Sequence, residues 1–289
     1  MGDNLTLTFL GTGDASGYPH PFCNCENCVE ARTTRGKSLR LRSHALINDE
    51  LLIDLSPDLL SSSFTNNKPL HGLKYVVQTH PHVDHLEPVH FGMRTERFGI
   101  TGLNEIGFWG TDASIQTIRE RLFSMTSTAG LSEDEALRHL KLSLTAIAPH
   151  ETFDVGPYRF TAVPASHDAP GVAVLYAIEL GDSAIFYGTD TGPIADDGLQ
   201  TLADRGIRFD VVILDHTMGI NEGTAGHMSA AMVRETWSRM DALGLLAPSA
   251  RLIGTHIAAH SNPVHEKVAA IAAESGYEIA YDGMVVTVG

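Results

Sequence analysis

Three histidines and one aspartate lie within six residues, directly after an apolar segment of the chain. The segment 73–78 is expected to form a buried strand, and His80 and His82 follow it. Side chains two residues apart on an extended backbone point the same way, so these two imidazoles should face one space. A turn beyond them would let Asp84 and His85 face it too. Imidazole and carboxylate groups bind Zn, Mn or Fe, and two such pairs so close together indicate two metal ions in one cleft.

Residues of the same types recur after later expected strands. They are His167 after 157–164, Asp190 after 183–188 and His256 after 252–255. A single histidine or aspartate at the end of a strand more often caps a turn than binds a metal. Their joint occurrence with the first group favours a role as additional ligands.

The chain's three cysteines form a second group of candidate metal ligands. Cys23, Cys25 and Cys28 have the spacing C-x-C-x-x-C in a turn-rich segment. Three thiolates at this spacing can hold one tetrahedral Zn ion, which then needs a fourth ligand. Inert buried thiols and a redox pair are the alternatives. An odd, clustered set argues against a disulfide framework and favours a reducing compartment, the cytoplasm.

The elements that must position these residues are expected in the order β-rich, helical, β-rich, helical. Strands are predicted at 4–11, 43–47, 51–55, 73–78, 157–164, 172–180, 183–188, 211–214, 252–255, 277–281 and 284–288, and helices at 57–64, 112–128, 131–142, 194–205, 229–243 and 263–275. This order fits two similar αβ halves with sheets inside and helices outside. We therefore predict an α/β fold, a four-layer αβ/βα sandwich formed by a single domain over residues 1–289.

The segment 87–145 is long for a connection between two strands. We predict that it is a helical insert, a helical hairpin packed on the sandwich. A lid over the cleft and a dimer surface are the alternatives. A dimer surface would make the protein a homodimer.

The charge of the chain limits its partners. The net charge is −15, so most of the surface repels nucleic acid and anionic membranes, and neither is an expected partner. No stretch approaches the roughly 20 apolar residues of a membrane span. A small anionic substrate would need strong local cations, which bound metal ions can provide.

The spacing His80-x-His82-x-Asp84-His85 resembles the signature of the metallo-β-lactamase superfamily. The resemblance implies the αβ/βα sandwich fold and a ligand set for two ions. One ion would be held by His80, His82 and His167, and the other by Asp84, His85 and His256. Asp190 would bridge the two ions together with a hydroxide, and Asp84 would also be a catalytic residue.

Within the superfamily, the cysteine cluster resembles the branch of the phosphoribosyl cyclic phosphodiesterase of the carbon–phosphorus lyase pathway and the pyrroloquinoline quinone biosynthesis protein B. The resemblance implies a structural zinc whose fourth ligand is a histidine shortly after the last active-site histidine. His260 is the matching residue, although it stands one residue further along than the closest family pattern. His20 and His265 are therefore kept as substitutes.

Further residues are candidates for supporting roles. His227, in Gly226-His227, precedes an expected helix N-terminus, a place suited to an anion. The phosphodiesterase-type relatives have a histidine in a similar context, which implies that His227 contacts phosphate or helps the leaving group depart. An exposed loop histidine is the alternative. Asp54 and Asp58 are candidates for orienting a metal-binding imidazole, and His216 is a candidate for supporting a ligand.

These residues together predict a metal-dependent hydrolase with two active-site divalent ions, Zn or Mn, and one structural Zn. The favoured reaction is attack of the bridging hydroxide on the phosphorus of a small phosphodiester, such as a cyclic nucleotide or a cyclic ribose phosphate. Hydrolysis of a lactone, thioester or β-lactam is one alternative, because the same ions would polarise a carbonyl. A non-hydrolytic role in cofactor biosynthesis, as in the quinone-biosynthesis branch, is the other.

Overall fold

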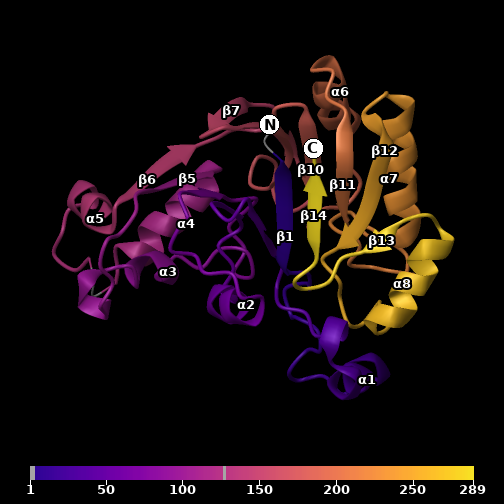
Figure 1. Ribbon diagram of the computed structural model, residues 1–289, viewed down its shortest axis with the longest axis horizontal. Coiled ribbons are helices and arrows are strands. Elements are labelled where there is room, and N and C mark those ends of the chain that lie inside the picture. Colours follow the sequence, from indigo (N-terminus) through magenta and orange to yellow (C-terminus); the bar gives the residue numbers. More distant parts are fainter. Residues whose placement is uncertain (1–3, 126–127) are drawn as a thin grey trace.

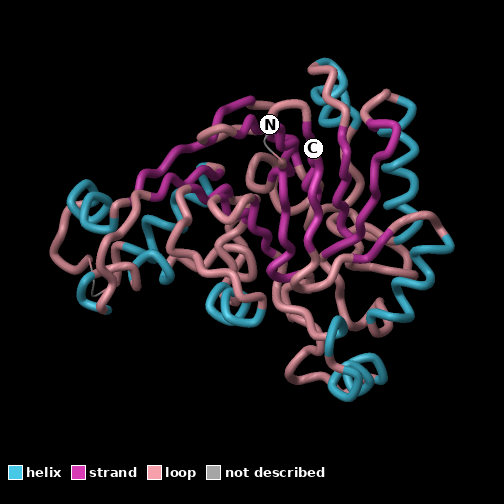
Figure 2. The backbone as a smooth tube through the Cα atoms, viewed as in Figure 1, coloured by secondary structure: helices cyan, strands magenta, loops and turns pink. Residues whose placement is uncertain are grey.

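The computed structural model describes residues 4–125 and 128–289, and within them two seven-stranded sheets pack face to face (Figures 1 and 2). The first sheet runs in the order β14 (Val285–Val288), β1 (Leu5–Gly11), β2 (His44–Ile47), β3 (Leu51–Ile53), β4 (Tyr75–Val77), β5 (Ile106–Gly110) and β6 (Leu142–Ala146). The second runs in the order β13 (Glu278–Ile279), β12 (Leu246–Thr255), β11 (Phe209–Asp215), β10 (Ser183–Gly188), β9 (Val174–Leu180), β8 (Tyr158–Pro164) and β7 (Thr152–Val155).

Helices cover the outer face of each sheet. The first sheet carries α2 (Leu59–Thr65), α3 (Val89–Gly92), α4 (Asp112–Leu122) and α5 (Glu133–Leu140), with the 3-10 turn η2 (Glu96–Phe98) after α3. The second carries α6 (Asp196–Asp204), α7 (Ala230–Ala242) and α8 (His265–Glu274). The helix α1 (Glu26–Thr34) and the 3-10 turn η1 (Gly36–Ser38) lie at one end of the molecule, at the bottom of Figure 1.

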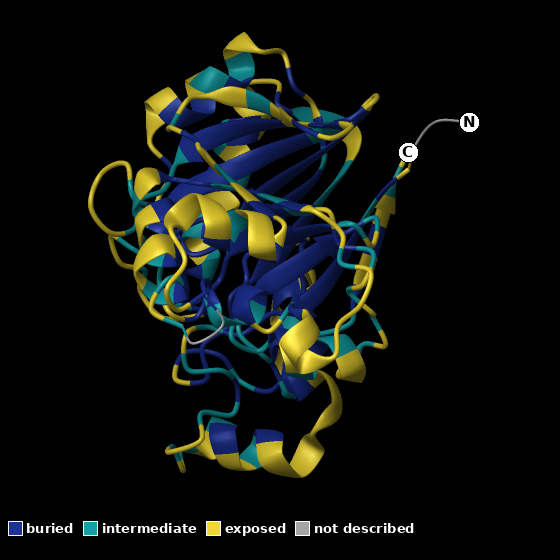
Figure 3. Ribbon diagram, turned by 90° about the vertical axis from the view of Figure 1, so that its left-hand side faces the viewer, coloured by how far each residue is buried: buried dark blue, intermediate teal, exposed yellow. Residues whose placement is uncertain are grey.

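The alternating direction of side chains along the strands produces three apolar layers. In β10, Ile185 and Tyr187 pack between the two sheets, whereas Ala184 and Phe186 pack toward the outer helices, because successive side chains of a strand point to opposite faces. Figure 3 shows the buried strands between largely exposed helices. The predicted four-layer αβ/βα sandwich is confirmed.

The segment 87–145 contains two strands as well as helices. β5 and β6 extend the first sheet in parallel with β4, so this segment is part of the sheet as well as its helical cover. The helix expected at 112–128 is α4, which ends at Leu122, and residues 126–127 of that prediction lie outside the described residues. The helix expected at 131–142 is α5, and Leu142 already begins β6.

Strand direction gathers several chain segments at one edge of the sandwich. β10, β11 and β12 are parallel to one another. β8 runs in the same direction as β10, because both strands are antiparallel to β9. Their carboxyl ends therefore share an edge. The loop after β4 is held against this edge from the first sheet, since the Val174 N–H donates to the carbonyl of Thr79 (3.1 Å) and the Tyr176 hydroxyl donates to that of Gln78 (2.6 Å).

Segments far apart in the chain join near the same edge. β14 pairs antiparallel with β1. Asp282, just before β14, accepts hydrogen bonds from the Thr12 hydroxyl (2.7 Å) and the Leu41 N–H (2.7 Å). The Thr12 carbonyl in turn accepts from the Ile257 N–H (2.8 Å). Gly11 makes this junction possible, because a Cβ there would lie 2.0 Å from the Arg42 carbonyl oxygen.

No helix in the described part of the chain has both the length and the apolar character needed to cross a membrane.

Candidate metal centre

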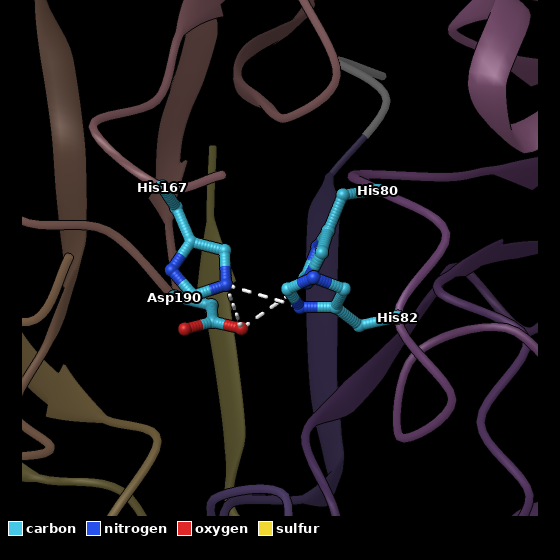
Figure 4. A group of neighbouring side chains, drawn as sticks. All are labelled: His80, His82, His167 and Asp190. Carbon is cyan, nitrogen blue, oxygen red and sulfur yellow. Dashed lines mark hydrogen bonds and ion pairs between the residues drawn. The ribbon is translucent and has the colours of Figure 1, made fainter. Parts of the chain in front are cut away.

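Four predicted ligands from three loops form the first group of the site. Ligand atoms of His80, His82, His167 and Asp190 all lie within 4.8 Å of one another (Figure 4). The Nδ1 atom of His82 is 3.1 Å from Nε2 of His167. The Oδ2 atom of Asp190 is 3.2 Å from Nε2 of His80 and 3.4 Å from Nε2 of His167.

A second group shares Asp190 with the first. It consists of Asp84, His85, Asp190 and His256, all buried. Asp190 Oδ2 lies 3.3 Å from Nε2 of His85 and 3.7 Å from Nε2 of His256. The structure therefore brings together all seven ligand residues expected from the sequence, in two groups with one carboxylate in common.

Asp54 orients two imidazoles through their Nδ1 atoms, that of His85 directly and that of His80 through Thr79. His85 donates from Nδ1 to Oδ2 of Asp54 (2.7 Å). The Thr79 hydroxyl donates to Oδ1 of Asp54 (2.8 Å), so it accepts from Nδ1 of His80 (2.9 Å). A hydrogen bond to one ring nitrogen selects the tautomer and leaves the other nitrogen free as a ligand.

Asp215, the last residue of β11, holds His256 through the same arrangement. The Thr217 hydroxyl donates to Oδ2 of Asp215 (2.8 Å) and lies 2.8 Å from Nδ1 of His256. Asp215 is not among the residues predicted from the sequence, where its signal is its place at the end of an expected strand. His216 beside it faces Asn262 and Tyr277 instead.

The remaining two imidazoles are oriented by groups near His167. Nδ1 of His167 lies 3.2 Å from the carbonyl oxygen of Gly226. Nε2 of His82 lies 3.1 Å from Oδ2 of Asp168, a residue that the sequence analysis did not select. Its one signal is that it follows His167 directly.

Several buried atoms of the two groups have no hydrogen-bond partner among the described residues. They are Nε2 of His80, His85 and His256, and Oδ1 of Asp190. Each such atom costs about 1–3 kcal/mol when left unsatisfied. Because the Nδ1 atoms are bonded elsewhere, the Nε2 lone pairs point at a carboxylate, a donor set that suits divalent cations. The residues present fit metal ions.

The charge states of the ligands also suit a metal. Burial lowers the pKa of His80 to about 4, so its imidazole is neutral. Burial alone would raise the pKa of Asp190, but the neighbouring imidazoles of His256, His227 and His80 outweigh burial and hold that pKa well below its usual range. Neutral imidazole and ionised carboxylate are the forms that coordinate metals.

His227 lies on a loop, and its half-buried imidazole faces the site. Its Nδ1 atom is 3.2 Å from Oδ1 of Asp190 and 3.5 Å from Oδ2 of Asp215. Burial lowers the pKa of His227, but hydrogen bonding to these two carboxylates more than compensates and raises it to about 10. Gly192 allows the approach, since a Cβ there would lie 1.9 Å from the Ala225 carbonyl oxygen on the loop that carries His227.

The three cysteines also gather, with ligand atoms within 4.8 Å of one another. Cys28 is buried in α1, and burial raises the pKa of its thiol to about 11. The pKa of Cys23 is lowered by hydrogen bonds from Cys25, whose N–H donates to its sulfur (3.4 Å). Three thiols within reach of one ion suit Zn.

No predicted fourth ligand joins this cysteine group among the described residues. His260 is exposed and is not part of it, although the neighbouring Ala259 carbonyl accepts from the Asn27 side chain (2.8 Å). Nδ1 of His265 pairs instead with Arg40 (3.0 Å). Nδ1 of His20 accepts the Phe22 N–H (3.1 Å).

Changing all three cysteines to serine should remove one tightly held Zn per chain and destabilise the fold. Loss of about 2 kcal/mol would lower Tm by roughly 4–8 °C in a chain of this size. Metal analysis and thermal unfolding measure both effects, with Thr33→Ala on the exposed side of α1 as the control. Full metal content and a normal Tm in the triple variant would exclude a structural zinc.

Asp168→Asn should weaken metal binding without unfolding the protein. Asp168 is exposed and contacts His82 on the nitrogen away from His167. Loss of such an orienting carboxylate typically costs about 10–100-fold in metal affinity. Competition with a chelator measures the change, and Asp197→Asn, in the same pocket lining but not in contact with His82, is the matched control. Equal affinities in both variants would remove the orienting role from Asp168.

Comparison with known proteins defines the class. The Beta-lactamase superfamily domain matches residues 49–257, which include all seven residues of the two ligand groups. The chain belongs to the beta-lactamase superfamily.

Particular relatives extend over the whole chain. The Coenzyme PQQ synthesis protein B of Acinetobacter baumannii (strain ACICU) is 24% identical over 322 residues, which cover 97% of this chain and 99% of the relative. A diphosphatase from the PhnP family has a similar structure, with a TM-score of 0.72, 21% identity and coverage of 100% of this chain and 98% of that one. Zn(2+)-bound PqqB from Methylobacterium extorquens has a TM-score of 0.71, 21% identity and coverage of 97% and 99%. These structures share the fold.

Proposed function

We propose that this chain is a dinuclear-metal hydrolase that cleaves small phosphodiesters. The observation that supports this most is the pair of four-residue groups sharing Asp190. Two divalent ions held by these residues would supply Lewis-acid charge to a phosphoryl group and would lower the pKa of a water toward neutrality. Zn and Mn both suit the donors.

The chain's own residues have distinct parts in this reaction. Asp54 and Asp215 keep the Nδ1 protons of His85 and of His256, the latter through Thr217, so that Nε2 faces the ions. His227, held by Asp190 and Asp215 through Nδ1, has its other nitrogen available to bind or protonate a substrate oxygen. This is the general-acid or phosphate-binding role proposed for it.

A pocket beside the first group favours a phosphodiester whose remaining part is uncharged over a substrate with a second phosphate. It has a volume of about 690 Å³, and His167, Asp168, Asp197 and Gly226 are in its lining. No lysine or arginine of the described chain lines it. The negative potential of two carboxylates would repel the second phosphate of a diphosphate, the substrate type named for the PhnP-family neighbour. A cyclic or sugar-type phosphodiester avoids this repulsion.

The proposal includes a structural Zn at the cysteines and a cytoplasmic location, since three thiolates persist in a reducing compartment. It requires a small anionic substrate. Nucleic acid and membranes are not among the proposed partners, because the net charge of −15 opposes both.

A substrate panel tests this function. Purified protein loaded with Zn or Mn should hydrolyse bis-p-nitrophenyl phosphate and cyclic nucleotides, and should act much more slowly on a lactone or a thioester. Protein carrying Asp190→Asn, prepared in parallel, controls for contaminating enzymes. Preference for the lactone or thioester would replace the proposal by acyl hydrolysis, and inactivity on every compound would favour the non-hydrolytic alternative.

A further inference from the structure

A cavity of about 460 Å³ lies on the outer side of the first sheet, separate from the metal ligands. Its wall is formed by α2, α3, the segment 100–104 and the start of β5. The apolar part of this wall includes Leu55, Leu59, Leu70, Leu73, Phe91 and Ile106. This size and lining are typical of a small-molecule site, which usually adds a few well-placed polar groups.

Arg94 supplies a positive charge to this cavity. One of its terminal nitrogens, Nη2, donates to the Asn104 carbonyl (2.7 Å). The other, Nη1, is buried and has no hydrogen-bond partner among the described residues. No carboxylate in the described part of the chain forms an ion pair with Arg94, and burial lowers the pKa of the guanidinium. Its charge is therefore partly desolvated and uncompensated, which is costly.

The wall around Arg94 contains no acidic residue, although the chain has 35 aspartates and glutamates. The other titratable groups facing the cavity are His71 and His90. Nε2 of His90 lies 3.1 Å from the Ser56 carbonyl oxygen, so this ring is already engaged. In a molecule of net charge −15, this cavity is a local region where an anion is not repelled.

We propose that this cavity binds a small amphipathic monoanion, a carboxylate with an unbranched apolar body, such as a medium-chain fatty acid. The carboxylate compensates the Arg94 guanidinium once a change of side-chain rotamer brings the buried Nη1 atom to the cavity surface, and the apolar body packs among the leucines and Phe91. Burial of the apolar body and the charge-assisted contact both favour binding. The site is independent of the metal-dependent reaction proposed above.

Titration calorimetry with decanoate and with its neutral analogue decanol tests the proposal. Wild-type protein should bind decanoate saturably and decanol more weakly. Arg94→Gln should weaken decanoate binding by roughly 10–100-fold, the effect of a lost charge-assisted hydrogen bond, and leave decanol unchanged. Arg97→Gln, an exposed arginine three residues away, is the matched control. Leu70→Trp, which fills the cavity, should abolish binding of both compounds while phosphodiester turnover persists.

Three results would overturn the proposal. The first is no saturable binding of decanoate to folded wild-type protein. The second is equal decanoate affinity in wild-type and Arg94→Gln protein. The third is a concentration-dependent dimer, seen by sedimentation, that Leu60→Glu dissociates and decanoate does not perturb. Leu60 is an exposed residue on the cavity wall, so this third result would assign the cavity to contact with a second copy of the chain.

Discussion

Asp190→Asn should reduce kcat for a phosphodiester by roughly 10³-fold, the equivalent of losing about 4 kcal/mol of charge stabilisation. Asp190 is the one carboxylate common to both ligand groups, so its loss weakens both ion sites at once. Asparagine is the right replacement because Asp190 has a φ of 54°, and asparagine tolerates this left-handed backbone better than alanine does.

Metal content and kcat should fall together in this variant, while the circular dichroism spectrum stays that of the wild type. Asp196→Asn is a suitable control, because the Asp196 side chain is exposed at the start of α6. If Asp190→Asn protein keeps both ions and turns over at the wild-type rate, Asp190 is neither a metal ligand nor needed for the reaction.

His227→Ala should cut kcat/KM for a phosphodiester by about 10²–10⁴, the usual contribution of a positioned acid or base. The two carboxylates beside Nδ1 hold a proton on the ring, since they raise the pKa of His227 to about 10. If His227 protonates the leaving oxygen, the loss should shrink for p-nitrophenolate, which needs no proton. If His227 binds the phosphoryl group, the loss should be the same for every leaving group.

Metal analysis distinguishes these two roles of His227 from a third role, coordination of a metal ion. Ligand atoms of His227, Asp190, Asp215 and His256 also lie within 4.8 Å of one another. Loss of an ion from His227→Ala protein would make this histidine a ligand. His150→Ala, an exposed histidine on a loop, controls for general effects of removing an imidazole. Wild-type kinetics on every phosphodiester would leave His227 without a function in the reaction.

The gathering of the candidate ligands was predictable because their residue types carry the signal. His80 and His82 alternate after a buried strand, and His167, Asp190 and His256 each follow a strand whose apolar run marks its end. Strand direction then brings these ends to one edge. The sequence pattern contains both the strand ends and the ligand types, so the site follows from the two together.

The groups that orient the ligands were harder to predict. Asp54 was considered, whereas Asp168 and Asp215 were missed, because an aspartate at a turn or strand end commonly caps a neighbouring backbone. Asp168 contacts His82, which lies 86 positions away in the sequence. Asp215 contacts His256 through Thr217, across a separation of 41 positions. Only tertiary structure defines those partners.

Local patterns also explain the missed elements. β5 has the sequence Ile-Gly-Phe-Trp-Gly, and glycine is depleted in strands. β6 is mostly not buried, so its short pattern was absorbed into the preceding helix. In α1, Cys28 and Ala31 are the buried residues, which makes no continuous apolar stripe for a helix prediction.

The pairing of β14 with β1 has a consequence for how the protein matures in a cell. During synthesis, His80 and His82 leave the ribosome long before Asp282 and β14 exist. Thr12 can pair with Ile257, beside His256, and with Asp282 only after those later residues have been synthesised. The candidate donor set is therefore brought together only after the C-terminal strand has paired with β1, late in the synthesis of these residues.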